Sequence, residues 1–534
     1  MDGGLLLLLL ATSLVPAVVI FLLPEHAETT RRTVNMVGAV AKVVLVSALV
    51  VGVFTGREYE WRAAFLPDID LVLRADPVPL LFVFLSALLW LTTTMYAIGY
   101  LADSTHRSRF FGFFSLCVAA TVGIALAGNL VTFLIFYELL TVTTYPLVVH
   151  EGDERARAAG RTYLLYTISG GAVLLVGAVW LQHLAGTVAF GRTDLLEALL
   201  ADHRGALTAI FVLLVGGLGV KAALVPLHGW LPHAMVAPAP VSALLHAVAV
   251  VKAGVYGIVR VVHDLYGAGL ASELNVLGPL AVVAVVTIVY GSLRALAQDD
   301  LKRRLAYSTV SQLSYIVLGV SIVGLTSVAG GLAHLVHQGV MKVTLFYCAG
   351  VLGHTFGLTR VSELRGVAHR APLTMALFAV AALGMMGLPP TVGFVTKWHL
   401  GLGGVEAGAA WVVPVLVGST ILNAAYFLPV IATAYRPAAA SAREPAAPVP
   451  APAGPVPRPA PPPASAGPRS RPGTPPGSTL VTRLRGLWGE ADPWLLLPTL
   501  ATGASVLVLG LLSGVPLSPI SWAEDIAREL LGRP

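Results

Sequence analysis

Charged residues are scarce in this sequence. Asp, Glu, Lys and Arg make up only 12% of its 534 residues, whereas 56% are hydrophobic. An ordinary soluble domain has about 25% charged and about 45–50% apolar residues. The composition therefore excludes a soluble globular protein, and we expect lipid to surround most of the chain.

Cysteine is also scarce, and nucleotide-binding motifs are absent. The two cysteines, Cys117 and Cys348, lie in separate apolar stretches and form no CxxC pair. The sequence thus predicts no disulfide framework and no zinc or iron–sulfur site, that is, no metal held by this chain. It contains no P-loop and no GxGxxG after a strand, so we expect no cofactor. Basic patches interleaved with aromatic residues are missing too, which argues against nucleic acid as a partner.

Long hydrophobic runs recur along the whole chain. A bilayer core about 30 Å thick needs about 20 apolar residues, and such runs predict an all-α polytopic membrane protein with about 14 transmembrane helices. The first run has no positive n-region and no evident cleavage site, so we interpret it as a retained helix rather than a signal peptide. The predicted spans are 4–23, 33–54, 78–100, 109–127, 128–149, 161–184, 207–232, 238–262, 275–297, 303–324, 328–355, 372–400, 409–435 and 493–515.

Lysine and arginine are unevenly distributed between the predicted loops. Loops after odd-numbered spans hold 21 of them, with Arg260 among the 6 assigned to loops after even-numbered spans. Cytoplasmic loops are enriched in Lys and Arg. The distribution therefore predicts that both termini lie outside the cytoplasm, in a cell membrane of the bacterial inner-membrane type.

Some charges lie inside the predicted spans. Five of the six lysines and Glu138 do so, although a charge at the bilayer centre costs about 2.5–3.5 kcal/mol on insertion scales. For Glu138 we favour a functional ion pair over a carboxyl group neutralised by a structural hydrogen bond. Lys42 has neither a proline break nor a second polar group beside it, so we interpret it as snorkelling or structural. The other four lysines are Lys221, Lys252, Lys342 and Lys397.

Two of these lysines stand beside prolines that break a helix. Pro226 follows Lys221, and Pro389 precedes Lys397, so helices 7 and 12 are predicted to be broken. Broken helices at membrane depth are typical of ion sites in transporters, and their recurrence suggests two inverted five-helix repeats. The predicted organisation is 1–108 for helices 1–3, 109–262 and 275–435 for the two repeats, 436–492 for a proline-rich cytoplasmic linker, and 493–534 for the last helix and a short tail.

Histidines accompany the lysines of the eighth and eleventh spans. His246 precedes Lys252 by six residues, about 9 Å of helical rise, so a proton would pass between them through water or another side chain. His334, Gln338 and Lys342 share one helix face at i, i+4 and i+8 and suit a chain of proton carriers. The alternatives are a satisfied core histidine at position 246 and an interhelical hydrogen bond at Gln338.

Five motifs occur together across roughly residues 70–435. They are Tyr137-Glu138, Lys221 with Pro226-Leu-His228-Gly-Trp230-Leu-Pro232, Ala237-Pro-x-Pro240-Val-Ser242-Ala-Leu-Leu-His246, Lys302-Arg-x-Leu-Ala306-Tyr-Ser308-x-x-Ser311-Gln312, and Gly387-Leu-Pro389-x-x-x-Gly393-Phe-x-x-Lys397. In combination they resemble the antiporter-like proton-translocating subunits shared by respiratory complex I and Mrp-type multisubunit cation/proton antiporters. The resemblance implies a fourteen-span core with two inverted five-helix repeats.

The resemblance also implies a function and roles for residues. Glu138 resembles the family's fifth-helix glutamate, and Lys221 resembles its lysine partner on the broken seventh helix. The expected function is proton translocation in a Na+/H+ or K+/H+ antiporter, with other membrane subunits as partners and no redox site in this chain. The residues expected to carry protons are Glu138, Lys221, His246, Lys252, His334, Lys342 and Lys397.

Finer features distinguish members of the family. Lys397 and the short tail with Glu524 resemble the D-type subunit of Mrp antiporters, whereas Gln338, beside His337, stands where a histidine is common and suggests a rerouted relay. The alternatives are a proton-pumping subunit of a complex I-like NADH:quinone oxidoreductase or membrane-bound hydrogenase, and a membrane partner of an inorganic-carbon uptake system. The spans hold no carboxylate cluster typical of a Na+ site, so we expect any metal cation path at an interface with another subunit.

Overall fold

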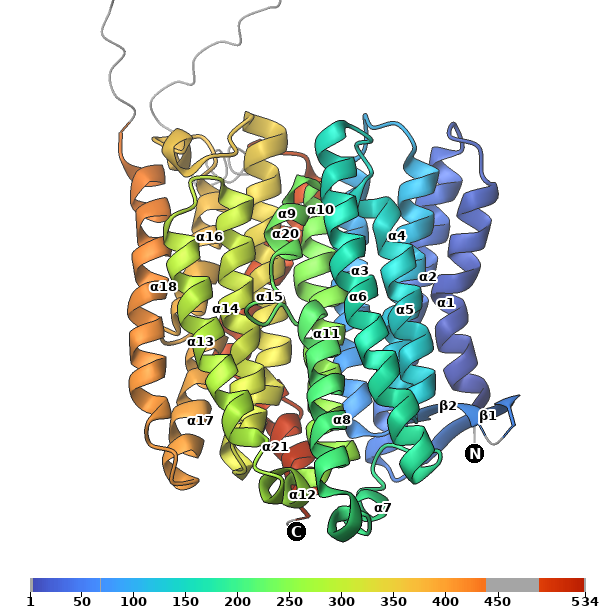
Figure 1. Ribbon diagram of the computed structural model, residues 1–534. Helices are drawn as coiled ribbons and strands as arrows, with labels where there is room; N and C mark the ends of the chain where they lie inside the picture. Colours follow the sequence, from blue (N-terminus) through green and yellow to red (C-terminus); the bar gives the residue numbers. More distant parts are fainter. Residues whose placement is uncertain (1–2, 68, 438–488, 533–534) are drawn as a thin grey trace, which may run out of the picture.

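The chain forms a bundle of long helices that run side by side through the height of the molecule (Figure 1). The computed structural model describes residues 3–67, 69–437 and 489–532. Within these residues, twelve helices are long and apolar enough to cross a membrane, which confirms a mostly helical, multi-pass membrane protein. They are α1 (Gly3–Leu22), α2 (Glu28–Phe54), α3 (Pro77–Tyr100), α4 (Arg107–Leu126), α5 (Leu130–Val148), α6 (Glu154–Ala185), α8 (Leu200–Lys221), the segment Ala239–Leu265, α13 (Leu277–Leu296), α15 (Leu325–Phe356), α18 (Val412–Tyr435) and α20 (Pro493–Leu511).

Two of the fourteen predicted spans are not among these twelve helices, for different reasons. Span 303–324 corresponds to α14 (Leu301–Ser321), whose buried residues include Ser308, Gln312 and Tyr315 and which is therefore less apolar. Span 372–400 is divided into α16 (Pro372–Met386) and α17 (Val392–Glu406), of 15 residues each. The total of 14 spans and the repeats stay predictions.

Span seven is interrupted where the proline pattern predicts. Helix α8 ends at Lys221, and the chain turns through residues 222–229 before the short helix α9 (Trp230–His233). Span eight contains two π-helical turns, which are often found at functional sites. Its parts are α10 (Ala239–Ala243), η2 (Leu244–Val248), α11 (Val250–Val259) and η3 (Arg260–Leu265).

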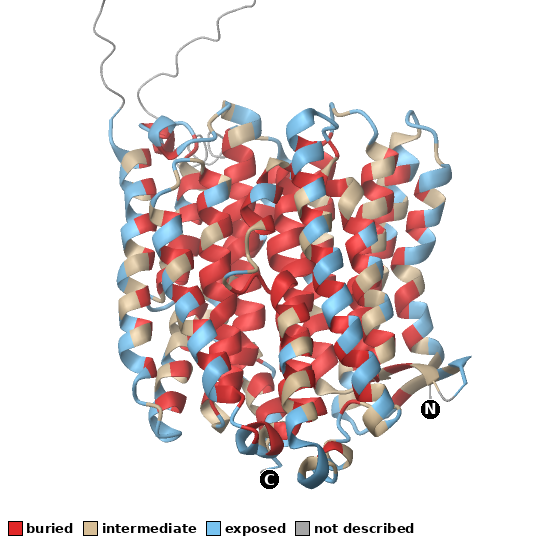
Figure 2. Ribbon diagram, viewed as in Figure 1, coloured by how far each residue is buried: buried red, intermediate tan, exposed pale blue. Residues whose placement is uncertain are grey.

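Burial is concentrated on the two central elements. The most apolar windows of Ala239–Leu265 and α15 are 100% and 94% buried, against 33% for α2 and α18. Figure 2 shows the same contrast between the middle of the bundle and its outer helices. Large apolar side chains such as Val44 on α2 and Ile421 on α18 are exposed, as expected for helices that face lipid. Polar groups on α15 are thus separated from lipid by other helices.

Both ends of the described chain lie at one face of the bundle (Figure 1). An antiparallel hairpin of β1 (Tyr59–Leu66) and β2 (Ile69–Ala75) lies at the same face. The all-helical prediction missed this hairpin, although polar and apolar residues alternate in part of each strand. The predicted linker 436–492 lies mostly outside the described residues. The remaining short elements are α7 (Asp194–Glu197), η1 (Ala234–Val236), α12 (Gly267–Glu273), η4 (Val361–Glu363), η5 (Val367–His369) and α21 (Pro519–Leu530).

Close packing at the interrupted helix predicts a stability effect. A Cβ atom at Gly393 would lie 1.8 Å from the carbonyl oxygen of Gly384, so Gly393→Ala must force α17 away from α16. Overpacking of this kind costs about 1–3 kcal/mol, and we expect a lower melting temperature of the purified protein. Gly401→Ala is the control, because its Cβ would lie at an ordinary 3.6 Å from Leu416. Equal melting temperatures for the two variants would contradict this packing.

Candidate functional site

The first predicted pair joins α5 to the end of α8. Lys221 is fully buried, and its ammonium group donates a hydrogen bond to the Tyr137 carbonyl and lies 3.3 Å from the centroid of the Tyr137 ring. Glu138 interacts with Lys221 electrostatically, and its Oε1 has no hydrogen-bond partner among the described residues. Gly171 of α6 leaves room for the carboxylate, since a Cβ there would lie 2.1 Å from Oε1. Among the described residues no ion pair of 4.0 Å or less joins these two side chains, so their interaction acts at longer range.

Helix α11 packs directly on the end of α8. A Cβ atom at Gly254 would lie 2.2 Å from the amide nitrogen of Ala222, so only glycine permits this approach. The indole nitrogen of Trp230 donates to the Val220 carbonyl, 2.7 Å away, and satisfies one of the carbonyl groups left free at the helix end. Lys221 is thus held next to the helix that carries Lys252.

The charged and imidazole groups of span eight face α15. The Lys252 ammonium donates to the carbonyl oxygen of Leu335, 2.7 Å away, beside His334. The His246 ring stacks on Phe346 with centroids 4.6 Å apart. Neither ring nitrogen of His246 has a hydrogen-bond partner among the described residues, so the interpretation of His246 as a satisfied core histidine has no support in these contacts.

The polar stripe of α15 faces α14. The Lys342 ammonium donates to the hydroxyl of Ser308 and to the Leu305 carbonyl, 3.0 Å away. Gln338 makes no side-chain hydrogen bond to any described residue, so the alternative of an interhelical hydrogen bond is not observed there. The His334 ring lies edge-on to the Tyr315 ring, with centroids 5.4 Å apart.

Lys397 lies at the second interruption. Its ammonium donates to the carbonyl of Met386, the last residue of α16, at 2.7 Å and to the hydroxyl of Thr420 on α18 at 2.8 Å. The same ammonium lies 5.6 Å from the centroid of the Tyr315 ring. Tyr315 therefore stands between His334 and Lys397. The seven predicted residues lie on α5, α8, η2, α11, α15 and α17, which follow one another across the bundle (Figure 1).

Several polar contacts beside this line were not predicted from the sequence. The first is the contact of Tyr315 with His334 and Lys397. A signal was present in the sequence, because the polar residues of span 303–324 indicate a helix that faces other helices rather than lipid. A second is the 2.7 Å hydrogen bond between His337 Nδ1 and the hydroxyl of Thr396, next to Lys397. The imidazole beside Gln338 therefore contacts the interrupted helix.

The tail helix α21 supplies a third contact. Glu524 Oε1 lies 3.6 Å from Nε2 of His399 on α17. His399 packs on Gly330 of α15, where an added Cβ would lie 3.1 Å from the Cβ of His399. Gly330 is four residues before His334, so His399 continues the polar stripe towards the face that holds the termini. No chemistry was predicted for this tail.

Two assignments of basic residues change. Placing Arg260 in a loop is wrong: it lies in η3, where it is 2% exposed, and its Nη1 is 2.8 Å from Asp264 Oδ2 and 3.7 Å from Asp76 Oδ1. The i, i+4 spacing of Arg260 and Asp264 is the sequence signal that the span continues.

Lys42 is fully buried and donates a hydrogen bond to the hydroxyl of Ser13. Its interpretation as a structural residue therefore holds, and its interpretation as a snorkelling residue does not.

Comparisons with known proteins place this arrangement among ion-translocating membrane subunits. A family described as "NADH:quinone oxidoreductase/Mrp antiporter, TM" matches residues 127–423. NADH-quinone oxidoreductase subunit N of Desulforudis audaxviator is 37% identical over 387 residues, which are 71% of this chain and 76% of that protein. A probable K+/H+ antiporter subunit of Rhizobium meliloti is 32% identical over 67% of this chain, but the chain spans only 36% of its length.

Solved structures share the fold over nearly the whole chain. A chain of the Mrp complex from Dietzia sp. DQ12-45-1b superposes with a TM-score of 0.78 at 23% identity, covering 98% of this chain and 100% of that one. A chain of an archaeal membrane-bound sulfane sulfur reductase gives 0.80 at 21% identity, covering 98% and 97%. At these identities the likeness establishes the fold alone.

The buried ion pair of Arg260 yields a second stability prediction. Asp264→Asn leaves Arg260 with only the more distant Asp76, and removing one partner of a buried ion pair costs about 3–5 kcal/mol. We expect a clear drop in the melting temperature of the purified protein. Asp194→Asn is the control, because the exposed Arg192–Asp194 pair, 3.0 Å apart, contributes little to stability. An Asp264→Asn variant as stable as this control would argue against a buried pair.

Proposed function

The chain belongs to the NADH:quinone oxidoreductase/Mrp antiporter family of transmembrane proteins, and we propose that it translocates protons within the membrane part of a multisubunit monovalent cation/proton antiporter. The observation that carries this proposal is the line of lysines on contacting elements from Lys221 to Lys397, of which Lys221, Lys252 and Lys342 are fully buried and Lys397 partly buried. Each of these ammonium groups donates to a backbone carbonyl. A neutral acceptor stabilises a proton without holding it as firmly as a carboxylate would.

Glu138 and Lys221 act as the switch. A carboxylate close to Lys221 stabilises its ammonium form, and withdrawal of the carboxylate in a low-dielectric site favours release of the proton. Glu138 is only partly buried, on the side of α5 towards α6, and Lys221 ends an interrupted helix. Both groups can therefore change position without disrupting a continuous helix.

From Lys221 the proton passes towards Lys397. His246 and Lys252 face α15, Lys342 and His334 continue along it, and the Tyr315 ring stands between His334 and Lys397. Buried polar groups usually bind a protein group or water, so water at His246 and Gln338 would bridge the longer gaps. Such coupled groups titrate as a set rather than singly.

The pair of His399 and Glu524 is the outlet of this path. It lies beyond His334 on the line of the α15 stripe, and both side chains are partly exposed, at 20% and 37%. The face that holds the termini carries few Lys and Arg residues, and we assign it to the non-cytoplasmic side.

Lys397 lines an apolar cavity of about 480 Å³ between α17 and α18, where a neighbouring subunit could supply the route for Na+ or K+.

The organisation into two inverted repeats is part of the proposal. Helices α6 and α15 each have 32 residues, and each is followed by a membrane segment that is interrupted next to a lysine. These matched features support repeats at 109–262 and 275–435. We assign the chain to the D type of Mrp antiporter subunits because Lys397 fits that pattern.

A second candidate is a proton-pumping subunit of a quinone-linked oxidoreductase. The similarity to subunit N of Desulforudis audaxviator, over 76% of that protein, favours it. Isolation of the native complex separates the two functions. Colourless hydrophobic partners support the antiporter, whereas flavin or iron–sulfur absorbance supports the oxidoreductase.

Removal of the switch should stop proton movement. Lys221→Ala and Glu138→Ala are each expected to lower cation-dependent proton flux at least tenfold, measured by quenching of a pH-sensitive acridine dye in vesicles that contain the assembled complex. Lys42→Met is the control, because Lys42 is buried but lies on α2, away from the path. Flux that survives both Lys221→Ala and Glu138→Ala in complexes of normal composition would refute the switch.

The outlet yields a separate prediction. His399→Gln and Glu524→Gln should each slow proton flux several-fold and change its pH profile, and the double variant should be no slower than the worse single variant because the groups act in series. Glu406→Gln is the control at the same face, where Glu406 accepts a hydrogen bond from Thr326. Additive losses, or a pH profile equal to that of the control, would remove His399 and Glu524 from the path.

A further inference from the structure

A cavity of about 640 Å³ lies away from the lysine line, near the face opposite the termini. Its walls come from α3 and α6, from the segment around η1 and α10, and from α14 and α15. None of the seven predicted proton-carrying residues lines it. The proposed proton path therefore leaves this cavity without a role.

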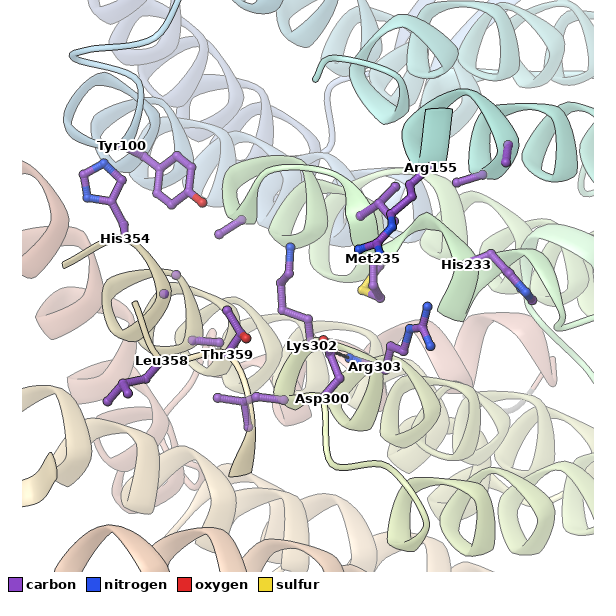
Figure 3. A pocket seen from close by; sticks show the side chains of 18 of the residues that line it. Tyr100, Arg155, His233, Met235, Asp300, Lys302, Arg303, His354, Leu358 and Thr359 are labelled. Atoms are coloured by element: carbon purple, nitrogen blue, oxygen red, sulfur yellow. Dashed lines mark hydrogen bonds between the residues drawn. The ribbon is translucent and has the colours of Figure 1, made fainter. Parts of the chain in front are cut away.

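Basic side chains converge on this cavity. Figure 3 shows Arg155 of α6 and Lys302 of α14 pointing towards each other across it, with Arg303 and His233 on one side and His354 on the other. The guanidinium groups of Arg155 and Arg303 form no hydrogen bond or ion pair with any described residue. Both arginines are exposed, so their donors are available to a ligand that enters the cavity from this face.

Carboxylates around the cavity balance these cations only in part. Asp300 is the one carboxylate among its described lining residues, and its Oδ1 already accepts a hydrogen bond from the backbone N–H of Arg303 at the start of α14. The Lys302 ammonium lies 2.8 Å from the Ala237 carbonyl, which carries no full charge. Glu151, which lies outside the lining, also acts electrostatically on Lys302. Three lining cations against two carboxylates still leave the cavity with a net positive charge.

We propose that this cavity binds a phosphate group, carried either by an anionic phospholipid or by a free phosphate. Arginine donates two parallel hydrogen bonds to phosphate oxygens, and lysine adds a compact point charge. Basic pockets between transmembrane helices are known binding sites for lipid head groups. A metal cation is a poor ligand here, because it would be repelled by Arg155, Lys302 and Arg303.

The bound phosphate bridges two parts of the bundle. Arg155 lies at the start of α6, the helix whose Gly171 packs against Glu138. Lys302 and Arg303 lie on α14, the helix that contacts Lys342 through Ser308. A ligand held by both helices fixes their separation at this face. This inference goes beyond the proposed proton path and does not depend on it.

The test compares three forms of the full-length chain, purified with its native partners. They are the wild type, the Arg155→Gln/Arg303→Gln double variant, and Arg157→Gln, in which an exposed arginine of α6 outside the cavity lining is changed. Binding of radiolabelled inorganic phosphate is measured by equilibrium dialysis. Retention of phosphatidylglycerol is measured by native mass spectrometry after incubation with vesicles of phosphatidylglycerol and phosphatidylcholine.

We expect the wild type and Arg157→Gln to bind one phosphate-bearing ligand and the double variant to bind it at least tenfold more weakly. Saturable retention of phosphatidylglycerol over phosphatidylcholine identifies a lipid as the source, and saturable binding of inorganic phosphate alone identifies the free anion. If the wild type and the double variant bind both probes equally, or if Arg157→Gln loses binding to the same extent, the site is refuted. An Arg155→Lys/Arg303→Lys variant, which keeps the charge and the fold, should retain intermediate affinity.

Discussion

Four lysine ammonium groups within the bundle, three of them fully buried and Lys397 partly buried, each bind a backbone carbonyl, and the rest of this structure depends on these contacts. Lys221 binds the carbonyl of Tyr137, Lys252 that of Leu335, Lys342 that of Leu305 and Lys397 that of Met386. A carbonyl has a second lone pair, so it can accept from lysine, but it brings no charge to balance the ammonium. Lys252, Lys342 and Lys397 therefore have no carboxylate in an ion pair with them among the described residues, whereas Lys221 also interacts with Glu138. Hydrogen bonds to neutral acceptors suit groups that must also release a proton.

The interrupted helices make these contacts possible. Met386 ends α16, and a helix end leaves carbonyl groups without intrahelical partners, one of which receives Lys397. Lys221 ends α8 itself, and Gly254 allows α11 to approach that end closely. Outer helices such as α2 and α18 then separate the polar centre from lipid. The packing that gives these charges hydrogen-bond partners therefore also keeps them away from lipid.

Hydrophobic length predicted most of the fold, because a segment that crosses lipid needs about 20 apolar residues wherever it stands in the bundle. The rule failed where a segment is surrounded by protein instead. Helix α14 carries Gln312 and Tyr315 because it packs on α13 and α15. Arg260 was placed in a loop although its nearer counter-charge, Asp264, stands only four residues later. Its second counter-charge, Asp76, is 184 positions away and became visible only as a 3.7 Å contact. The β1–β2 hairpin was missed because its short strands lie between two strong helical signals.

The sequence by itself determined which lysines lie within the bundle and where the helices break, because both follow from local composition: a lysine within an apolar run and a proline near it. It also carried the family motifs that name Glu138, Lys221 and Lys397. Only the tertiary structure decided what each group contacts. Tyr315 between His334 and Lys397, Glu524 beside His399, and Arg155 opposite Lys302 each join helices far apart in the sequence. Such pairs depend on how helices pack against one another, and no local pattern records that packing.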